Sequence, residues 1–165
     1  MISRKDAIGV IVALLVLSSS ISINLLTIDQ GINVPFTLIL EKYIHSMQDA
    51  RTLVITDNET WSSLWSEIYH VNGPPPKILY VNFTCEWLIV VCLGTRPMGG
   101  YTLNITSISR TLLSYKVFYT ETGGGAGIAM EIYPLQIVKI SEFPADLPVS
   151  FYYSYSESPV LSELS

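Results

Sequence analysis

The residue types that most often do chemistry are scarce in this chain and form no recognised pattern. His45 and His70 are its two histidines, and Cys85 and Cys92 are its two cysteines. Their spacing does not match a zinc or copper site, and the sequence holds no nucleophile elbow and no zinc-protease motif. Carboxylates are dispersed, so no local pair is indicated as acid and base. We therefore expect no catalytic residue, no metal and no cofactor.

The two cysteines are not expected to form a disulfide. Cys85 and Cys92 fall in a stretch that we interpret as one strand. Their odd spacing puts the side chains on opposite faces, and an extended chain would separate them by about 23 Å. A disulfide is much shorter. We expect two small, buried, apolar thiols.

A glycine-bearing loop is the best candidate for recognition of a partner. The segment from Gly94 to Tyr101 reads Gly-Thr-Arg-Pro-Met-Gly-Gly-Tyr, in which proline and glycines let the chain turn. An exposed arginine and a flexible methionine often anchor protein interfaces. We therefore predict that this loop and a second one, from Thr122 to Gly127, contact a partner protein. The predicted contact residues are Arg96, Pro97, Met98, Gly99, Gly100, Tyr101, Gly123, Gly124 and Gly125. The alternative interpretation is that both loops only turn the chain.

Three sequons are consistent with a location outside the cytoplasm. They begin at Asn58, Asn82 and Asn104, and each is followed by threonine two residues later. Each permits N-glycosylation where the asparagine is exposed and the cell has the machinery. Asn104 falls on the polar face of its predicted strand, so a sugar there would not disturb the core. Such triplets also arise by chance in a chain rich in Asn and Thr.

Two strands are expected to position the first loop. The stretch from Trp87 to Leu93 is apolar at every position, which indicates a strand covered on both faces. After the loop, Tyr101, Leu103 and Ile105 alternate with polar residues, the pattern of a strand with one wet face. We predict that the two strands form a hairpin around which the rest of the domain packs.

The remaining pattern predicts a mainly β domain with one helix. Further strands are expected at 34–40, 50–56, 113–120, 130–140 and 149–155, and Pro35 at the start of the first of them suits an edge position. Trp61, Leu64, Trp65 and Ile68 have helical spacing and form one apolar face. Thr56, Asp57 and Asn58 are the candidate helix caps, and a proline-rich link at 73–76 ends the helix. The fold class is therefore all-β to α+β, an antiparallel sheet or sandwich with one helix packed on it.

The first 28 residues are expected to be a membrane anchor or a signal. Arg4 and Lys5 precede an apolar stretch at residues 7–26, which as a helix would be about 30 Å long. A cleaved secretory signal has a similar pattern. We favour a retained anchor because apolar residues continue beyond a signal's usual length. Positive charge stays inside, so the domain would lie outside a cell membrane, or be secreted after cleavage.

The predicted organisation has three parts: an anchor or signal at 1–28, an extracytoplasmic β-domain at 29–155 and a polar tail at 156–165. The chain has 165 residues and a formal net charge of −5 at pH 7. That negative charge argues against binding to nucleic acid. The start of the chain, Arg-Lys-Asp-Ala-Ile-Gly-Val-Ile, also resembles archaeal type IV pilin-like proteins. A pilin-like or adhesion subunit is therefore one alternative.

The strand, loop and strand at 89–105 resemble the C-terminal domain of the PrcB family, which is named for a surface-anchored subunit of a bacterial protease complex. The shared pattern is an apolar strand, a glycine, a short loop with proline, Gly-Gly-Tyr and an alternating strand. The Trp-bearing helix, the proline-rich link and the segment 133–140 extend the resemblance to about residues 50–142. The glycine run at 123–127 departs from the family's usual Pro-rich segment. The resemblance implies a non-catalytic module that binds or stabilises a partner protein, such as a surface protease.

A second resemblance concerns the two loops. Arg96 to Tyr101 and Gly123 to Gly127 are similar to two of the three binding loops of chagasin-type cysteine-protease inhibitors, which are β-sandwiches. The third loop of those inhibitors carries Arg-Pro-Trp, and this chain has no match to it after residue 127. Inhibition of a papain-like protease is therefore a second alternative.

Overall fold

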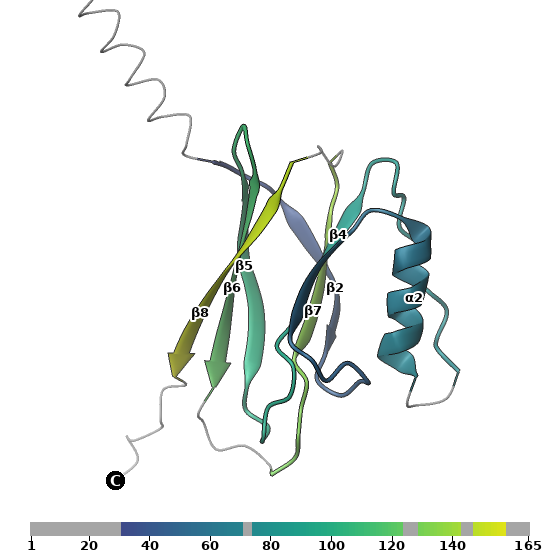
Figure 1. The fold of residues 1–165 in the computed structure, drawn as a ribbon, viewed down its shortest axis with the longest axis vertical. Coiled ribbons are helices and arrows are strands. Elements are labelled where there is room, and N and C mark those ends of the chain that lie inside the picture. Colours follow the sequence, from purple (N-terminus) through teal and green to yellow (C-terminus); the bar gives the residue numbers. More distant parts are fainter. Residues whose placement is uncertain (1–30, 71–73, 124–128, 143–146, 158–165) are drawn as a thin grey trace, which may run out of the picture.

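The described part of the protein is a two-sheet sandwich with one helix on the outside of one sheet (Figure 1). The computed structural model describes residues 31–70, 74–123, 129–142 and 147–157. The apolar stretch at 7–26, in which an anchor is predicted, lies outside them. Within the described residues no helix is long and apolar enough to cross a membrane.

The two sheets have four strands each. Sheet A has the order β1, β5, β6, β8, and its strands are Ile32–Asn33, Thr102–Arg110, Tyr115–Gly123 and Val149–Glu157. Sheet B has the order β2, β7, β4, β3, and its strands are Phe36–Lys42, Leu135–Ile140, Trp87–Cys92 and Arg51–Ile55. All neighbours are antiparallel except β6 and β8, which are parallel. The predicted mainly β class is confirmed, with one parallel pair that the alternation pattern could not reveal.

Strand β4 is buried on both faces because its sheet, sheet B, lies between sheet A and the helix. One set of its alternating side chains, Trp87, Ile89 and Val91, packs against sheet A. The other set, Leu88, Val90 and Cys92, packs against the helix. All six residues of the strand are buried. The uninterrupted apolar run that predicts a doubly covered strand is thereby explained.

Helix α2 (Asn58–Tyr69) covers the outer face of sheet B. Its four buried residues are the predicted ones: Trp61, Leu64, Trp65 and Ile68. Asp57 is the N-cap, and its carboxylate accepts a hydrogen bond from the Thr60 amide at 2.8 Å. The indole nitrogens of Trp61 and Trp65 donate to the Leu79 and Pro76 carbonyls, each at 2.9 Å. The proline-rich link therefore packs back along the helix.

The predicted hairpin is wrong, although both of its strands exist. β4 belongs to sheet B and β5 to sheet A, so the loop between them crosses from one sheet to the other. β4 instead pairs with β3 and β7. The hydrophobic pattern indicates which faces a strand buries, but it does not indicate which strand is its neighbour.

The expectation for the cysteines is also wrong in part. Cys85 is exposed, in a turn before β4, and Cys92 is buried at the end of that strand. Both are free thiols, so no disulfide joins them. The turn arises because the backbone amides of Cys85 and Glu86 both donate to the Asn82 carbonyl.

Some strand limits differ from the prediction. β6 begins at Tyr115 and continues to Gly123, and β7 begins only after Pro134, which lacks an amide hydrogen to donate. β8 continues to Glu157, two residues into the predicted polar tail. Pro35 precedes β2, which lies at the edge of sheet B as that proline suggested.

A buried glutamine joins the two sheets. Gln136 on β7 accepts a hydrogen bond from the Ile105 amide at 2.8 Å and donates one to the Leu103 carbonyl at 3.0 Å. β1 has only two residues and pairs with Ser109 and Arg110, so among the described residues the start of β5 has no strand neighbour on that side. The amide side chain of Gln136 supplies these hydrogen bonds instead.

Candidate functional site

The predicted recognition loop lies at one end of the sandwich, where the chain passes from β4 to β5 (Figure 1). The backbone holds it on two sides. The Thr95 amide donates to the Gln48 carbonyl at 3.0 Å, and Arg96 forms an antiparallel bridge with Ile132. Gly94 has a φ of 73°, and a Cβ there would lie 2.7 Å from the Ala50 nitrogen. Only glycine fits this conformation and this close approach.

Arg96 is bound within the protein and does not project freely. Its Nε and Nη2 donate to the two carboxylate oxygens of Glu121 at 2.5 and 2.7 Å. Its Nη1 donates to the carbonyls of Leu93 and Thr95 at 2.8 and 3.0 Å. The side chain is 24% exposed and that of Glu121 is 3% exposed. The expectation of an exposed Arg96 is therefore wrong, because a buried carboxylate on β6 needs this cation.

The ion pair and a tyrosine shift one another's pKa values. The hydrogen bonds from Arg96 lower the pKa of Glu121 below its ordinary value. The same carboxylate accepts a hydrogen bond from the Tyr153 hydroxyl at 2.8 Å. Burial, together with this hydrogen bond, raises the pKa of Tyr153 to about 12. Glu121 therefore stays ionised and links β8 to the loop through Arg96.

Other tyrosines surround this ion pair. The Tyr119 and Tyr153 rings lie 5.6 Å apart, and the Arg96 guanidinium lies 6.0 Å from the centre of the Tyr101 ring. Tyr153 and Tyr155 are 53% and 49% exposed. We call Tyr101, Tyr119, Tyr153 and Tyr155 the tyrosine cluster. Tyrosine offers apolar area and a polar tip together, and it is enriched at protein interfaces.

The two predicted loops do meet, at their strand ends. A Cβ on Gly123 would lie 2.2 Å from the Tyr101 ring, so the ring covers this glycine. Thr102 pairs with Thr122 one residue away. Gly124 and Gly125 lie outside the described residues. Tyr101 and Gly123, one predicted contact residue from each loop, therefore lie against each other.

The rest of the predicted loop is displayed at the surface. Met98 is 40% exposed, Pro97 and Gly100 are exposed, and Gly99 is partly buried. Gly100 has a φ of 95°, a conformation that favours glycine. Met98 is therefore exposed, while the side chain of Arg96 on the same loop is bound to Glu121.

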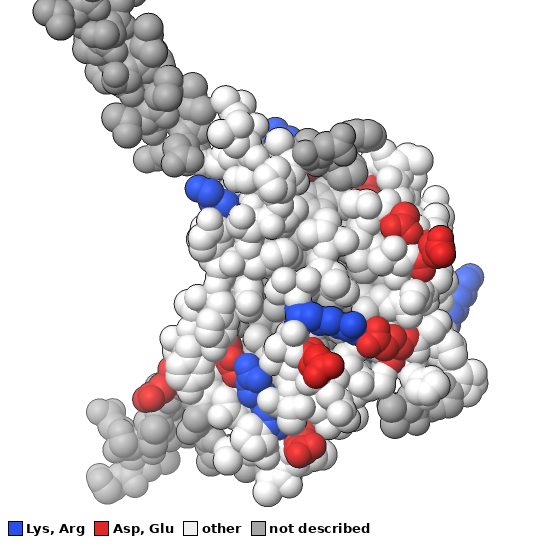
Figure 2. Space-filling view, in the orientation of Figure 1, with Lys and Arg blue, Asp and Glu red and all other residues white. Residues whose placement is uncertain are grey.

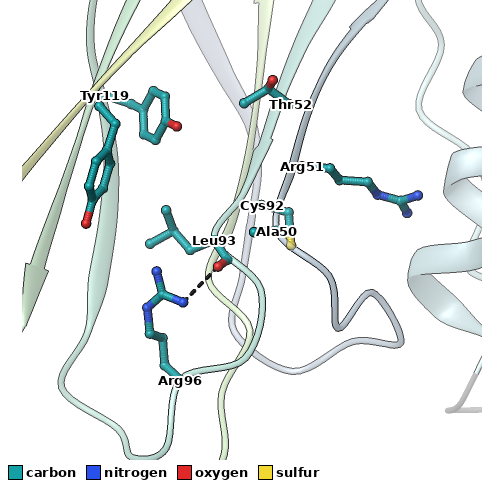
Figure 3. Close-up of a pocket in the computed structure, with 8 residues that line it drawn as sticks. Ala50, Arg51, Thr52, Cys92, Leu93, Arg96 and Tyr119 are labelled. Carbon is teal, nitrogen blue, oxygen red and sulfur yellow. Dashed lines mark hydrogen bonds between the residues drawn. The ribbon is translucent and has the colours of Figure 1, made fainter.

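An open hollow of about 430 Å³ lies beside the tyrosine cluster, between β8 of one sheet and β3 of the other (Figure 3). Its lining residues are Ala50, Arg51, Thr52, Cys92, Leu93, Arg96, Tyr119 and Tyr153. Figure 3 shows the side chain of Arg51 pointing away from Arg96, toward the helix, where it forms an ion pair with Glu67 at 2.5 Å. The two arginines that line the hollow are thus each paired with a glutamate.

The histidines and thiols do not gather into a site among the described residues. No group of three His, Cys, Asp or Glu side chains there could hold a metal ion. His45 is buried; its Nδ1 accepts from the Met47 amide at 3.0 Å, and its Nε2 lies 2.6 Å from the Tyr133 carbonyl. Burial lowers its pKa, so the neutral ring fits both contacts. Burial also raises the pKa of the Cys92 thiol.

The three sequons differ in accessibility. Asn58 and Asn104 are exposed, on the helix and on the outer face of sheet A. Asn82 is partly buried, and its side-chain oxygen accepts hydrogen bonds from both the amide and the hydroxyl of Thr84. Asn58 and Asn104 are therefore better placed for modification.

The sequence interpretation missed Glu121, Tyr119, Tyr153 and Tyr155 as members of this site. A signal for Glu121 was present, because it continues the inward alternation of Tyr115, Val117 and Tyr119 on β6. A carboxylate at an inward position needs a cationic partner. That partner, on a loop 25 residues earlier, could be identified only from the fold.

Comparison with known proteins supports the resemblance of the loop and its two flanking strands to the PrcB C-terminal domain. No curated protein and no solved structure gave a significant match to the chain. A family model described as PrcB C-terminal matches residues 87–141. The matched segment runs from the start of β4 to just beyond the end of β7 and includes the recognition loop, but not helix α2. Residues 87–141 of this protein therefore carry the PrcB C-terminal pattern, as their strand, loop and strand sequence predicted.

Proposed function

We propose that this protein is a non-catalytic binding module, anchored in a membrane by residues 7–26, whose domain lies outside the cytoplasm and associates with a partner protein. The proposed partner belongs to a surface protease complex. The match to the PrcB C-terminal model supports an association of this kind. The basic start, the apolar stretch and the exposed sequons at Asn58 and Asn104 support the location.

One observation carries the proposal: hydrogen bonds from Arg96 hold the loop in place, while the apolar side chain of Met98 on the same loop is exposed. Arg96 makes four hydrogen bonds that hold the loop against β6 and its own backbone. Met98 is exposed on that loop, and Arg96 of the same loop shares the Glu121 carboxylate with the half-exposed Tyr153 of β8. A contact surface that is already ordered costs less conformational entropy on binding than a loop that must be ordered by its partner.

The test is capture of partners from membranes that contain the full chain. The wild type and Met98→Asp should be expressed with an affinity tag, crosslinked in native membranes and purified, and the captured proteins identified by mass spectrometry. Burying a charge in an apolar contact is unfavourable, so Met98→Asp should reduce capture about tenfold or more. A protease subunit among the proteins lost would support the proposal.

Leu113→Asp is a matched control. Leu113 is 79% exposed and lies in the turn between β5 and β6, at the opposite end of the sandwich from Met98 (Figure 1). The Leu113→Asp variant introduces the same negative charge and should leave the amount of captured protein unchanged. If the two variants capture the same proteins in the same amounts, or if the wild type captures none, the proposed function is wrong.

A further inference from the structure

One of the four edge strands lacks the features that protect sheet edges. β1 has two residues, and β3 has five. β2 is irregular between Leu38 and Leu40 and ends in Glu41 and Lys42. Short length, bulges and charged residues are the usual protections of an edge. β8 has nine residues, pairs with β6 without a register shift, contains no proline, and has Glu157 as its single charged residue.

Among the described residues, the backbone groups on the outer side of β8 therefore have no strand partner. β8 is the last strand of sheet A, and among the described residues no strand pairs with its second side. Unpaired amides and carbonyls along a regular strand are a template for another extended chain. An edge of this length can pair with a segment of comparable length.

Side chains on both faces of β8 are fixed and available for contact. On the outer face, Tyr152 stacks on Phe118 with ring centres 5.0 Å apart. On the inner face, the Glu121 carboxylate holds Tyr153, and Tyr155 is half exposed beyond it. Aromatic side chains contribute most to pairing when a neighbouring strand packs against them.

The hollow gives an added strand a place for its inward side chains. It lies between β8 and β3, the two edge strands on one side of the sandwich. Leu93, Tyr119 and Tyr153 supply much of its lining. A strand about 4.8 Å beyond β8 would direct alternate side chains toward this space. Figure 2 shows that the charged side chains on the face seen in Figure 1 are scattered over both halves among many uncharged residues.

We propose that an extended segment of a partner protein adds to sheet A as a fifth strand beside β8, with apolar side chains at alternate positions directed into the hollow. This inference rests on the proposed function, and it specifies how the partner is recognised. The charge of the surface selects the segment. Residues 147–157 carry one charge, the exposed carboxylate of Glu157, and the chain as a whole is negative. A segment with a basic residue beside Glu157 is favoured, and an acidic segment is repelled.

The test uses a displayed library of random peptides long enough to cover β8, selected on the intact chain. Synthetic versions of the selected peptides should alternate apolar residues and carry lysine or arginine. Hydrogen exchange should then be measured with and without peptide. Peptide binding is expected to slow exchange of β8 amides on the order of tenfold or more, because they become hydrogen-bonded. Amides of β2 serve as the internal control and should not change.

Charge reversal provides a second readout on a folded protein. Glu157→Lys should weaken the selected basic peptides by up to about fivefold, the range of an exposed ion pair. Glu59→Lys introduces the same change on the exposed side of the helix and should have no effect. Equal affinities for the two variants would contradict the predicted position of the basic residue.

Several outcomes would overturn the proposal. Selection of no peptide would do so, as would peptides that protect the loop from Gly94 to Tyr101 but not β8. Protection of β8 that increases with protein concentration alone would assign the edge to a second copy of this chain. A membrane partner that is captured but leaves β8 unprotected would overturn strand addition and leave the proposed function intact. Peptides that protect β8 while membranes yield no partner would overturn the proposed function alone.

Discussion

Two regions of the molecule are held together by different kinds of contact: the interface between helix α2 and sheet B, and the loop end of sheet A. Between helix α2 and sheet B the core is apolar, with residues such as Trp61 and Ile68 1% and 0% exposed, and the Arg51–Glu67 ion pair lies at its partly exposed margin. At the loop end, sheet A buries a carboxylate, Glu121, and neutralises it with Arg96. The first region gains free energy from each apolar group it buries. The second gains little beyond the cost of desolvating its charges, so it specifies geometry more than stability.

The largest expected effect is on the apolar side. Trp61→Ala should lower the free energy of unfolding by about 4 kcal/mol, since it leaves a cavity under the helix and removes the hydrogen bond to Leu79. Urea denaturation followed by circular dichroism measures this. Tyr80→Ala, at a residue that is 86% exposed, is the control and should change stability by less than about 0.5 kcal/mol. Equal effects would mean that the helix does not depend on this contact.

The next effect concerns the ion pair. Glu121→Leu should cost about 3 kcal/mol, because Arg96 loses its counter-charge while it remains largely buried. The double variant Arg96→Met with Glu121→Leu should regain most of that stability, since no charge is then left unpaired. A double-mutant cycle by urea denaturation gives both values. A double variant that is less stable than either single one would show that the pair contributes more than orientation.

A pH dependence distinguishes the two regions. The pKa of Glu121 is lowered in the folded state, so its contribution to stability is complete above its unfolded value and is lost as the pH falls through the folded one. We expect the stability difference between wild type and Glu121→Gln to be constant near neutral pH and to shrink below pH 4.5, the ordinary value for this group. Thermal unfolding between pH 7 and pH 3 measures it. Trp61→Phe, compared with the wild type in the same way, should show a difference that does not vary with pH.

The smallest effect is at the helix cap. Asp57→Ala removes the acceptor for the Thr60 amide and should lower the melting temperature by about 2–4 °C. Asp57→Asn keeps a capping oxygen and should lie close to the wild type. If both substitutions destabilise equally, the charge of Asp57 rather than its hydrogen bond stabilises the helix.

Most of the individual elements could be predicted from the sequence. The apolar face of the helix, the doubly buried strand β4 and the edge position of β2 all follow from local periodicity and from proline. The pairing of strands could not be predicted. β4 and β5 are adjacent in the chain but belong to different sheets, and β8 is parallel to β6. Periodicity reports which face is buried and carries no information about the neighbour.

The candidate site, like the fold, could be predicted from the sequence only in part. The loop could be identified from its glycines, its proline and the resemblance that the PrcB C-terminal match supports. Met98 is exposed on this loop, whereas Arg96, which was expected to be exposed, is bound to a buried carboxylate. Whether an arginine faces solvent or a buried carboxylate depends on the residue that the fold places beside it. For Arg96 that residue is 25 positions away.

The positions of strands, helix and turns follow from local sequence, because these elements depend on side-chain periodicity, on capping and on the restrictions of proline and glycine within a few residues. The fold, in contrast, brings Arg96, Glu121 and Tyr153 into one hydrogen-bonded cluster, and leaves β8 without a strand neighbour on its outer side among the described residues. These features depend on contacts between distant segments. Their free energies arise from burial and charge pairing that no local stretch of sequence contains.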